Sequence, residues 1–277
     1  MVHSNCHTHT VFCDGKNTPE EMVQSAIQKG FVCLGFSFHC PMTPDACWTI
    51  RPEKLGDYTA EIRRLQEQYA DKLEILHGVE LDRDFCGVDP KQFDYVIASV
   101  HQLTKGEQHF DVDETAETLQ ACCSAFYGGD WFSLAADYYE RLSSFVVDVQ
   151  PTVVGHYDLI EKFNEHGALF DSNDPRYLAI AKIHIDRILA HCPNVLFEVN
   201  TGAMYRCGKA QPYPMAPLLR YLREKGAKVI VTSDSHNTAS LDFAFDTALA
   251  SIRAAGFREV YELRRQNGKT VMKATAV

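Results

Sequence analysis

The feature that most constrains the fold of this chain is an alternation of short apolar runs with segments of helical spacing, which continues along most of its 277 residues. The apolar runs have the length and the β-branched content of buried strands, and we expect strands at 2–7, 31–39, 73–81, 95–100, 152–156, 195–200 and 228–232. The segments between them are expected to be helices, at 18–29, 51–69, 114–147, 175–191, 216–225 and 241–255. Alternation of this kind predicts a parallel sheet whose strands are joined by helical crossovers.

Local signals support several of these boundaries. Thr18, followed by Pro19 and two glutamates, has the pattern of a helix N-cap. Gly128-Gly129 predicts that the segment 114–147 forms two helices, and Asn267-Gly268 predicts the turn of a small C-terminal hairpin.

Residues that can bind a metal ion stand at or just beyond the ends of the expected strands. They are His7, His9, Asp14, His39, Glu80, His101, His156, Asp234 and His236. In an extended segment such as 7–9, residues two apart point to the same face, so both imidazoles can reach one ion. A single histidine at a strand end is more often a hydrogen-bonded core residue. So many polar strand ends together predict a metal site.

The number of contributing strand ends also decides between two α/β architectures. An open doubly wound sheet gathers its ligands mainly at one switch point, whereas a barrel collects them from every strand at its carboxyl mouth. We therefore expect an α/β barrel of about seven strand–helix units. No linker rich in Pro, Gly or Ser divides the chain, so residues 1–277 are expected to form one domain.

Composition argues against several classes of function. The formal net charge of −10 disfavours nucleic acid as a partner, because phosphates favour a basic footprint. No run approaches the roughly 18 apolar residues of a membrane span, and the first residues lack the features of a signal peptide, so we expect a cytoplasmic protein. The ten cysteines form no C-x-x-C pair and are expected to be reduced, although Cys13 and Cys40 adjoin proposed ligands.

The motifs around the strand ends resemble those of the PHP (polymerase and histidinol phosphatase) superfamily, in the same order. They are H-T-H-T at 7–10, F-S-F-H at 36–39, G-V-E at 78–80, S-V-H at 99–101, G-H-Y-D-L at 155–159 and S-D-S-H at 233–236. The segment E-V-N-T-G at 198–202, followed by Arg206, looks more like the monofunctional histidinol-phosphatase branch. The polymerase modules of the other branch would require a far longer chain.

The resemblance implies a distorted (β/α)7 TIM-like barrel with two or three divalent ions of Zn, Mn or Fe at the carboxyl mouth of its strands. By analogy, one ion would be held by His7, His9, Glu80 and Asp234. Glu80 would bridge to a second ion held by His101 and His156. A third would be held by Asp14, His39 and His236, although some relatives have histidine in place of Asp14.

The implied activity is hydrolysis of L-histidinol phosphate to L-histidinol and phosphate, a step of histidine biosynthesis, by a hydroxide that bridges two ions. Arg206 is expected to bind the phosphate through hydrogen bonds. Asp234 or His236 is expected to supply a proton to the leaving alkoxide. Asn200 and Tyr157, which lie within the motifs, are expected to contact the substrate.

Three alternatives stay open at this point. The same barrel could act on another small phosphate ester, such as a nucleotide or a sugar phosphate. A metal-stabilised binding module without activity would be expected to have lost ligands, yet every expected position carries a donor. An amidohydrolase barrel also begins with H-x-H, but it usually has a lysine at a middle strand end, where this chain has Glu80. The sequence leaves the oligomeric state open.

Overall fold

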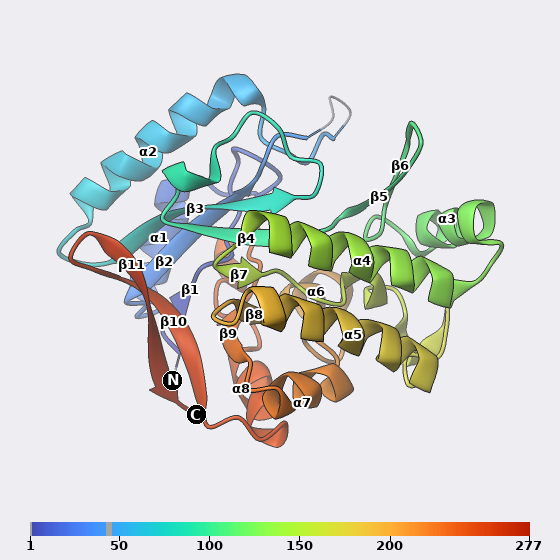
Figure 1. Ribbon diagram of the computed structural model, residues 1–277. Helices are drawn as coiled ribbons and strands as arrows, with labels where there is room; N and C mark the ends of the chain where they lie inside the picture. Colours follow the sequence, from blue (N-terminus) through green and yellow to red (C-terminus); the bar gives the residue numbers. More distant parts are fainter. Residues whose placement is uncertain (1, 43–45) are drawn as a thin grey trace.

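The computed structural model describes residues 2–42 and 46–277, and its centre is a curled parallel sheet (Figure 1). Within these residues, parallel strands are neighbours in the order β1-β2-β3-β4-β7-β8-β9. Their bounds are β1 (Ser4–Asn5), β2 (Cys33–His39), β3 (Glu74–Asp82), β4 (Tyr95–Ser99), β7 (Val153–Val154), β8 (Leu196–Asn200) and β9 (Lys228–Thr232). The predicted strands therefore all form, and they run side by side as the alternation requires.

The two ends of this sheet meet at the carboxyl side of the strands. There Thr8 and Ser235 form a parallel bridge, in which the N–H of His9 donates to the Ser235 carbonyl at 2.7 Å. At the opposite side a hairpin of β10 (Glu259–Gln266) and β11 (Lys269–Ala276) adds to β9. The side chain of Glu262 in β10 accepts a hydrogen bond from Ser4 Oγ at 3.0 Å, which ties the hairpin to β1. The expected distorted barrel is confirmed, and its closed end is the mouth where the candidate ligands stand.

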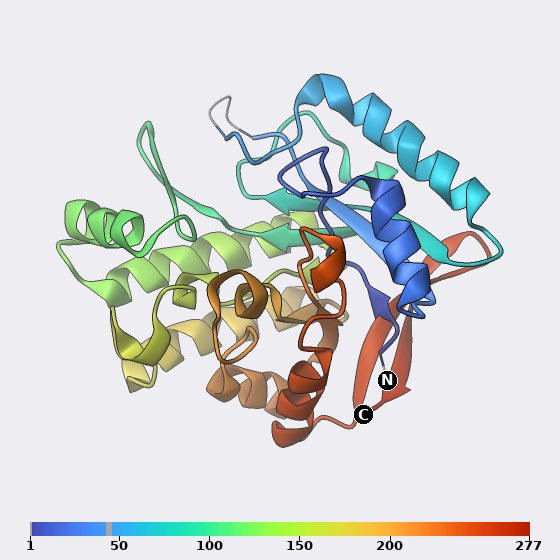
Figure 2. The ribbon, with the colours of Figure 1, turned by 180° about the vertical axis from the view of Figure 1, so that it is seen from behind.

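Helices cover the outer face of the sheet, with α4 and α5 packed together on one flank and α1 and α2 on another (Figures 1 and 2). Their bounds are α1 (Pro19–Gln28), α2 (Leu55–Gln68), α3 (Ala116–Tyr127), α4 (Trp131–Val149), α5 (Pro175–His191), α6 (Gly202–Cys207), α7 (Ala216–Glu224) and α8 (Phe245–Ala254). Short 3-10 turns include η1 (Pro52–Lys54), η2 (Pro90–Gln92), η3 (Leu159–Glu161), η4 (Glu165–Gly167) and η5 (Thr238–Ser240). No helix among the described residues is long and apolar enough to cross a membrane.

The predicted start of α1 and the predicted break between α3 and α4 are both confirmed. Thr18 and Glu21 form a capping box, in which the Thr18 N–H donates to the Glu21 carboxylate at 2.8 Å. Gly128 ends α3 in the left-handed region at φ 60°. Helix α8 begins later than predicted, because Ala244 has a φ of 56° and cannot continue a right-handed helix.

Helix α6 and the antiparallel hairpin of β5 (Gln102–Lys105) and β6 (Gln108–Asp111) were not predicted. Strands of four mainly polar residues give no clear hydrophobic period, so the pattern could not find them. Both elements lie at the mouth of the barrel and supply residues to the site described below.

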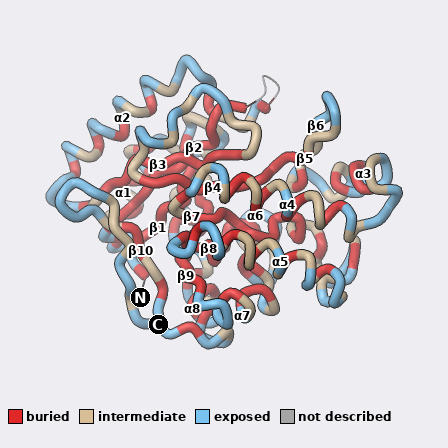
Figure 3. Tube along the Cα trace, in the orientation of Figure 1, coloured by how far each residue is buried: buried red, intermediate tan, exposed pale blue. Residues whose placement is uncertain are grey.

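The interior of the barrel is filled below the site by a small apolar cluster that includes Tyr95. Its ring crosses the interior, and its hydroxyl donates to the carbonyls of Cys6 and Phe36. Glycines at 35 and 78 make room, because a Cβ there would lie 2.4 and 2.2 Å from Tyr95 atoms. The larger core lies between sheet and helices, and buried residues follow the strands in Figure 3. All ten cysteines are free, as predicted.

Candidate metal centre

A buried carboxylate at the mouth of the barrel is surrounded by histidines. Glu80, late in β3, is 1% exposed. Imidazole nitrogens lie 3.0–3.7 Å from its two oxygens, and they belong to His7, His9, His39, His101 and His156. Burial alone would raise the pKa of Glu80, but the surrounding histidines outweigh it and hold that pKa well below its usual value. Glu80 is therefore the anion around which the site is built.

All the predicted ligands converge on this mouth, in four overlapping groups of donor atoms that lie within 4.8 Å of one another. The groups are His7, His9 and Asp234; His7, Glu80 and His156; His39, Glu80 and His101; and His9, Asp14, His39 and His236. Two histidines are shared in a way that the resemblance did not imply. His9 lies with the Asp14 group as well as with Asp234, and His39 lies with Glu80 as well as with Asp14.

The donor set fits divalent metal ions. His7 Nε2, His9 Nε2 and Glu80 Oε2 are buried without a hydrogen-bond partner among the described residues. Leaving such atoms unsatisfied costs about 1–3 kcal/mol each, and a cation among them would satisfy all three at once. Imidazole and carboxylate donors together suit Zn, Mn or Fe.

Two carboxylates behind the ligands fix their orientation, and neither was predicted as a site residue. Glu198 in β8 accepts from His7 Nδ1 at 2.6 Å, and Asp82 in β3 lies 3.0 Å from His101 Nδ1. In both cases the Nε2 atom of the ring is left to face Glu80. The sequence did contain a signal for both residues, because each is a charged side chain within a mainly apolar strand. Burying such a charge is costly unless it is paired.

Arg206, Asp234 and His236 form a second cluster at the rim. The guanidinium of Arg206 in α6 donates to the Asp234 carboxylate at 2.8 Å and to its carbonyl at 2.7 Å, and lies 2.9 Å from His236 Nδ1. Gly202 allows α6 to approach this closely, because a Cβ there would lie 2.9 Å from that of Asp234. Asp234 itself has a φ of 47°, which is uncommon outside glycine and aims its side chain into the site.

Two predicted substrate contacts have different positions from those expected. Tyr157 is fully buried, and its hydroxyl donates to the carbonyl of Ala181 at 2.7 Å. Asn200 is 1% exposed, and its side chain bonds Glu198 and the N–H of Gly202. We therefore assign Tyr157 to the core and Asn200 to the support of α6, in place of the substrate contacts that the sequence suggested.

Cys13 and Cys40 also lie behind the ligands. Cys13 Sγ is 3.6 Å from His9 Nδ1, and Cys40 Sγ accepts from the N–H of Asp82 at 3.3 Å. Burial raises the pKa of Cys13 to about 12, and the charge of Asp14 adds to this. Both residues are therefore expected to remain neutral thiols that support the site.

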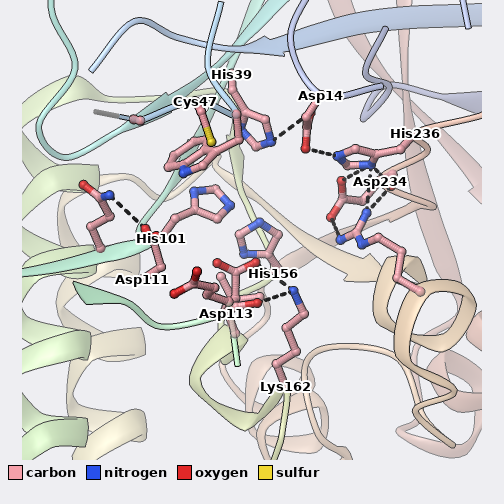
Figure 4. Close-up of a pocket in the computed structure, with 16 residues that line it drawn as sticks. Asp14, His39, Cys47, His101, Asp111, Asp113, His156, Lys162, Asp234 and His236 are labelled. Atoms are coloured by element: carbon pink, nitrogen blue, oxygen red, sulfur yellow. Dashed lines mark hydrogen bonds and ion pairs between the residues drawn. The ribbon is translucent and has the colours of Figure 1, made fainter. Parts of the chain in front are cut away.

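Above the candidate metal ligands lies a pocket of about 410 Å³ (Figure 4), a size usual for small-molecule sites. Its lining includes seven of the predicted residues, namely Asp14, His39, His101, His156, Arg206, Asp234 and His236. Other lining residues were not predicted, namely Ala46, Cys47, Trp48, Gln102, Asp111, Asp113, Glu114, Leu159 and Lys162. Most of the additional polar residues come from β5, from β6 and from the loop that follows it.

Comparisons with known proteins agree with this geometry. The family model of the PHP domain matches residues 4–202. A Deinococcus radiodurans protein named "Probable histidinol-phosphatase" is 31% identical over 264 residues, which cover 92% of this chain and 94% of that protein. The histidinol-phosphatase of Bacillus subtilis is 26% identical and covers 88% of this chain and 97% of its own length.

A solved structure shares the fold. It is the histidinol phosphate phosphatase of Lactococcus lactis, crystallised with zinc, L-histidinol and phosphate. It superimposes with a TM-score of 0.65 at 22% identity, and the match covers 98% of this chain and 99% of the other.

Proposed function

The chain belongs to the PHP domain family, and from that membership and the geometry of its pocket we propose that it is a metal-dependent histidinol-phosphatase. The reaction is hydrolysis of L-histidinol phosphate to L-histidinol and phosphate. The observation that carries the proposal is the full set of nine donors at one mouth of the barrel, directly beneath a pocket that Arg206 lines. Curated relatives that match along most of their length carry the same name, and residues 1–277 are proposed to act as one domain.

The centre is proposed to hold two or three ions of zinc, manganese or iron. Glu80 would be shared between ions, because its two oxygens face different histidines. Oε2 faces His7 and His39, and Oε1 faces His156. When bound, divalent ions supply positive charge that polarises a phosphoryl oxygen and makes water more acidic.

Arg206 is proposed to hold the phosphate group. A guanidinium has five N–H donors, and the contacts with Asp234 and His236 involve only NH1 and NH2. The remaining donors belong to a side chain that lines the pocket. A phosphate dianion can accept two parallel hydrogen bonds from such a group.

Asp234 and His236 are the residues proposed to move a proton at the leaving oxygen. Burial would raise the pKa of Asp234, but the charges of Arg206 and His7 outweigh it and hold that pKa well below its usual value. Asp234 therefore stays a carboxylate. His236 lines the same pocket and is 13% exposed. We therefore favour a water held beside His236 as the proton donor, with His236 positioning that water.

Steady-state release of phosphate tests the proposal. Protein loaded with Zn²⁺ or Mn²⁺ is assayed with L-histidinol phosphate, nucleoside monophosphates and sugar phosphates. We expect the highest kcat/KM with L-histidinol phosphate, loss of activity on chelation, and recovery on adding metal back. A higher kcat/KM for a nucleotide or a sugar phosphate would overturn the substrate assignment. No release from any ester by the loaded protein would overturn the activity.

A further inference from the structure

The pocket carries opposite charge at its two ends. Arg206 lies at one end, against Asp234 and His236. At the other end, strand β6 and the loop after it bring Asp111, Asp113 and Glu114 into the lining. Figure 4 shows Asp111 near His101 and Asp113 near His156, across the pocket from Asp234 and His236. A ligand that spans the pocket would meet a cation at one end and acids at the other.

Among the residues that the structure describes, one of these acids, Asp113, has a cationic partner. Lys162 donates to the Asp113 carboxylate at 2.8 Å and to its carbonyl at 2.7 Å. The Asp111 carboxylate accepts from Gln102 at 2.8 Å, and that of Glu114 accepts from Thr118 at 3.1 Å. Within the described part of the chain, no ion pair with Lys, Arg or His involves either acid. An ammonium group would supply the cationic partner that Asp111 and Glu114 lack among these residues.

An independent observation concerns Gln102 in β5, which lines the same end of the pocket. The residue is 5% exposed, and its Nε2 donates to Asp111. Its Oε1 is buried and has no hydrogen-bond partner among the described residues. A buried acceptor without a donor is costly. The Oε1 atom of Gln102 therefore needs a hydrogen-bond donor, which a ligand with N–H or O–H groups would supply.

We propose that Gln102, Asp111 and Glu114, together called the acidic wall, bind the ammonium group of the substrate. The ligand class is a phosphate monoester of an amino alcohol, with its phosphate at the Arg206 end and its ammonium at the wall. This inference rests on the proposed function and deepens it, because L-histidinol phosphate carries a primary amine in addition to its imidazole. An ammonium has three donors, and it pairs with ionised acceptors through strong charge-assisted bonds.

A metal ion fits the wall less well than an ammonium. The groups of three or more metal-binding side chains in the described residues include neither Asp111 nor Glu114. An amide oxygen and two carboxylates that already accept other bonds suit a small donor of hydrogen bonds better than a coordinated ion.

The test compares L-histidinol phosphate with the same ester in which hydrogen replaces the amino group. For the wild-type protein we expect kcat/KM to favour the amine ester by about 10- to 100-fold, the value of a hydrogen bond between charged groups. In Asp111→Asn, and further in Asp111→Asn combined with Glu114→Gln, this preference should fall towards one. Glu107→Gln removes an acid from the exposed turn of the same hairpin, and it should keep the wild-type preference.

The ratio of the two esters within each variant separates recognition from folding, because a misfolded protein loses both activities together. An unchanged ratio in the double variant would overturn the proposal, as would a wild-type ratio near one. If the wild-type protein hydrolyses neither ester, the proposed function fails, and calorimetric binding of L-histidinol still tests the wall. Binding by wild type that weakens at least tenfold in Asp111→Asn would support it, and no binding by wild type would overturn it.

Discussion

The Nδ1 atom of His7 lies 2.6 Å from Oε1 of Glu198, and both side chains are fully buried. This contact leaves Nε2 of His7 to face Glu80 at 3.1 Å. The second oxygen of Glu198 accepts from the backbone N–H of His156 at 2.9 Å. One carboxylate behind the site therefore positions two proposed ligands that follow different strands, His7 after β1 and His156 after β7.

Glu198→Gln should weaken metal binding without removing a ligand. An amide keeps the shape of the side chain but loses the charge that orients the His7 imidazole. Mutation of a residue that hydrogen-bonds to a metal-binding histidine usually lowers metal affinity by about 10- to 100-fold. Zinc affinity is measured by competition with a chelator. The control is Glu262→Gln, a buried acid at the other end of the barrel that bonds Ser4, and it should keep the wild-type affinity. Equal affinities for the two variants would contradict the role given to Glu198.

Glu80→Gln should remove more than one ion at once. Its carboxylate is close to imidazole nitrogens of five histidines, at 3.0–3.7 Å, and a neutral amide cannot bridge cations in the same way. Asp14→Asn is the matched comparison, because Asp14 is 32% exposed and belongs to one donor group only. Elemental analysis after dialysis should therefore find a larger loss for Glu80→Gln than for Asp14→Asn. Wild-type metal content in Glu80→Gln would contradict the bridging role.

The sequence predicted the barrel and the gathering of the candidate ligands at its mouth because both depend on local patterns. A histidine directly after an apolar run, as at His39 or His101, is visible in one segment, and parallel strands bring such ends together. The carboxylates Asp82 and Glu198 were missed, although Asp82 lies two residues after Glu80 in β3 and Glu198 lies two residues before Asn200 in β8. Their function depends on which histidine lies beside them, and that is a tertiary relationship.

The acidic end of the pocket could not be predicted for a different reason. Strands β5 and β6 are short and mostly polar, so neither periodicity nor propensity marks them. The assignment of Tyr157 to the substrate has the opposite cause. The residue lies inside a motif next to His156, where the chain turns after β7, and its buried hydroxyl donates to the carbonyl of Ala181 in the core.

Arg206→Ala should weaken inhibition by inorganic phosphate and raise KM. Loss of hydrogen bonds between charged groups costs about 1–3 kcal/mol, which is roughly a 5- to 150-fold change in Ki. A fall in kcat is also expected, because Arg206 holds Asp234 through two contacts. The surface variant Arg176→Ala, whose side chain is 70% exposed, should keep the wild-type Ki. An unchanged Ki in Arg206→Ala would remove the residue from the phosphate site.

His77 should make folding stability depend on pH in the acid range. Its ring centroid lies 5.4 Å from that of Tyr58 and 4.9 Å from that of Phe93, and the residue is 7% exposed. Burial lowers the pKa of His77 from 6.5 to about 4, although the charge of Asp94 partly opposes this. Between these two values the unfolded chain binds a proton that the folded protein does not bind. Stability is therefore lost as the pH falls through this window.

The measurement is the free energy of unfolding of wild type and His77→Phe at pH 7 and at pH 5, in the same buffer and with the same metal content. Phenylalanine fills a similar space and cannot titrate, while the site histidines contribute equally to both proteins. Each pH unit in the window is worth up to about 1.4 kcal/mol. Wild type should therefore lose up to about 2 kcal/mol more than the variant between the two conditions. Equal losses would mean that His77 is protonated as readily in the folded protein as in the unfolded chain.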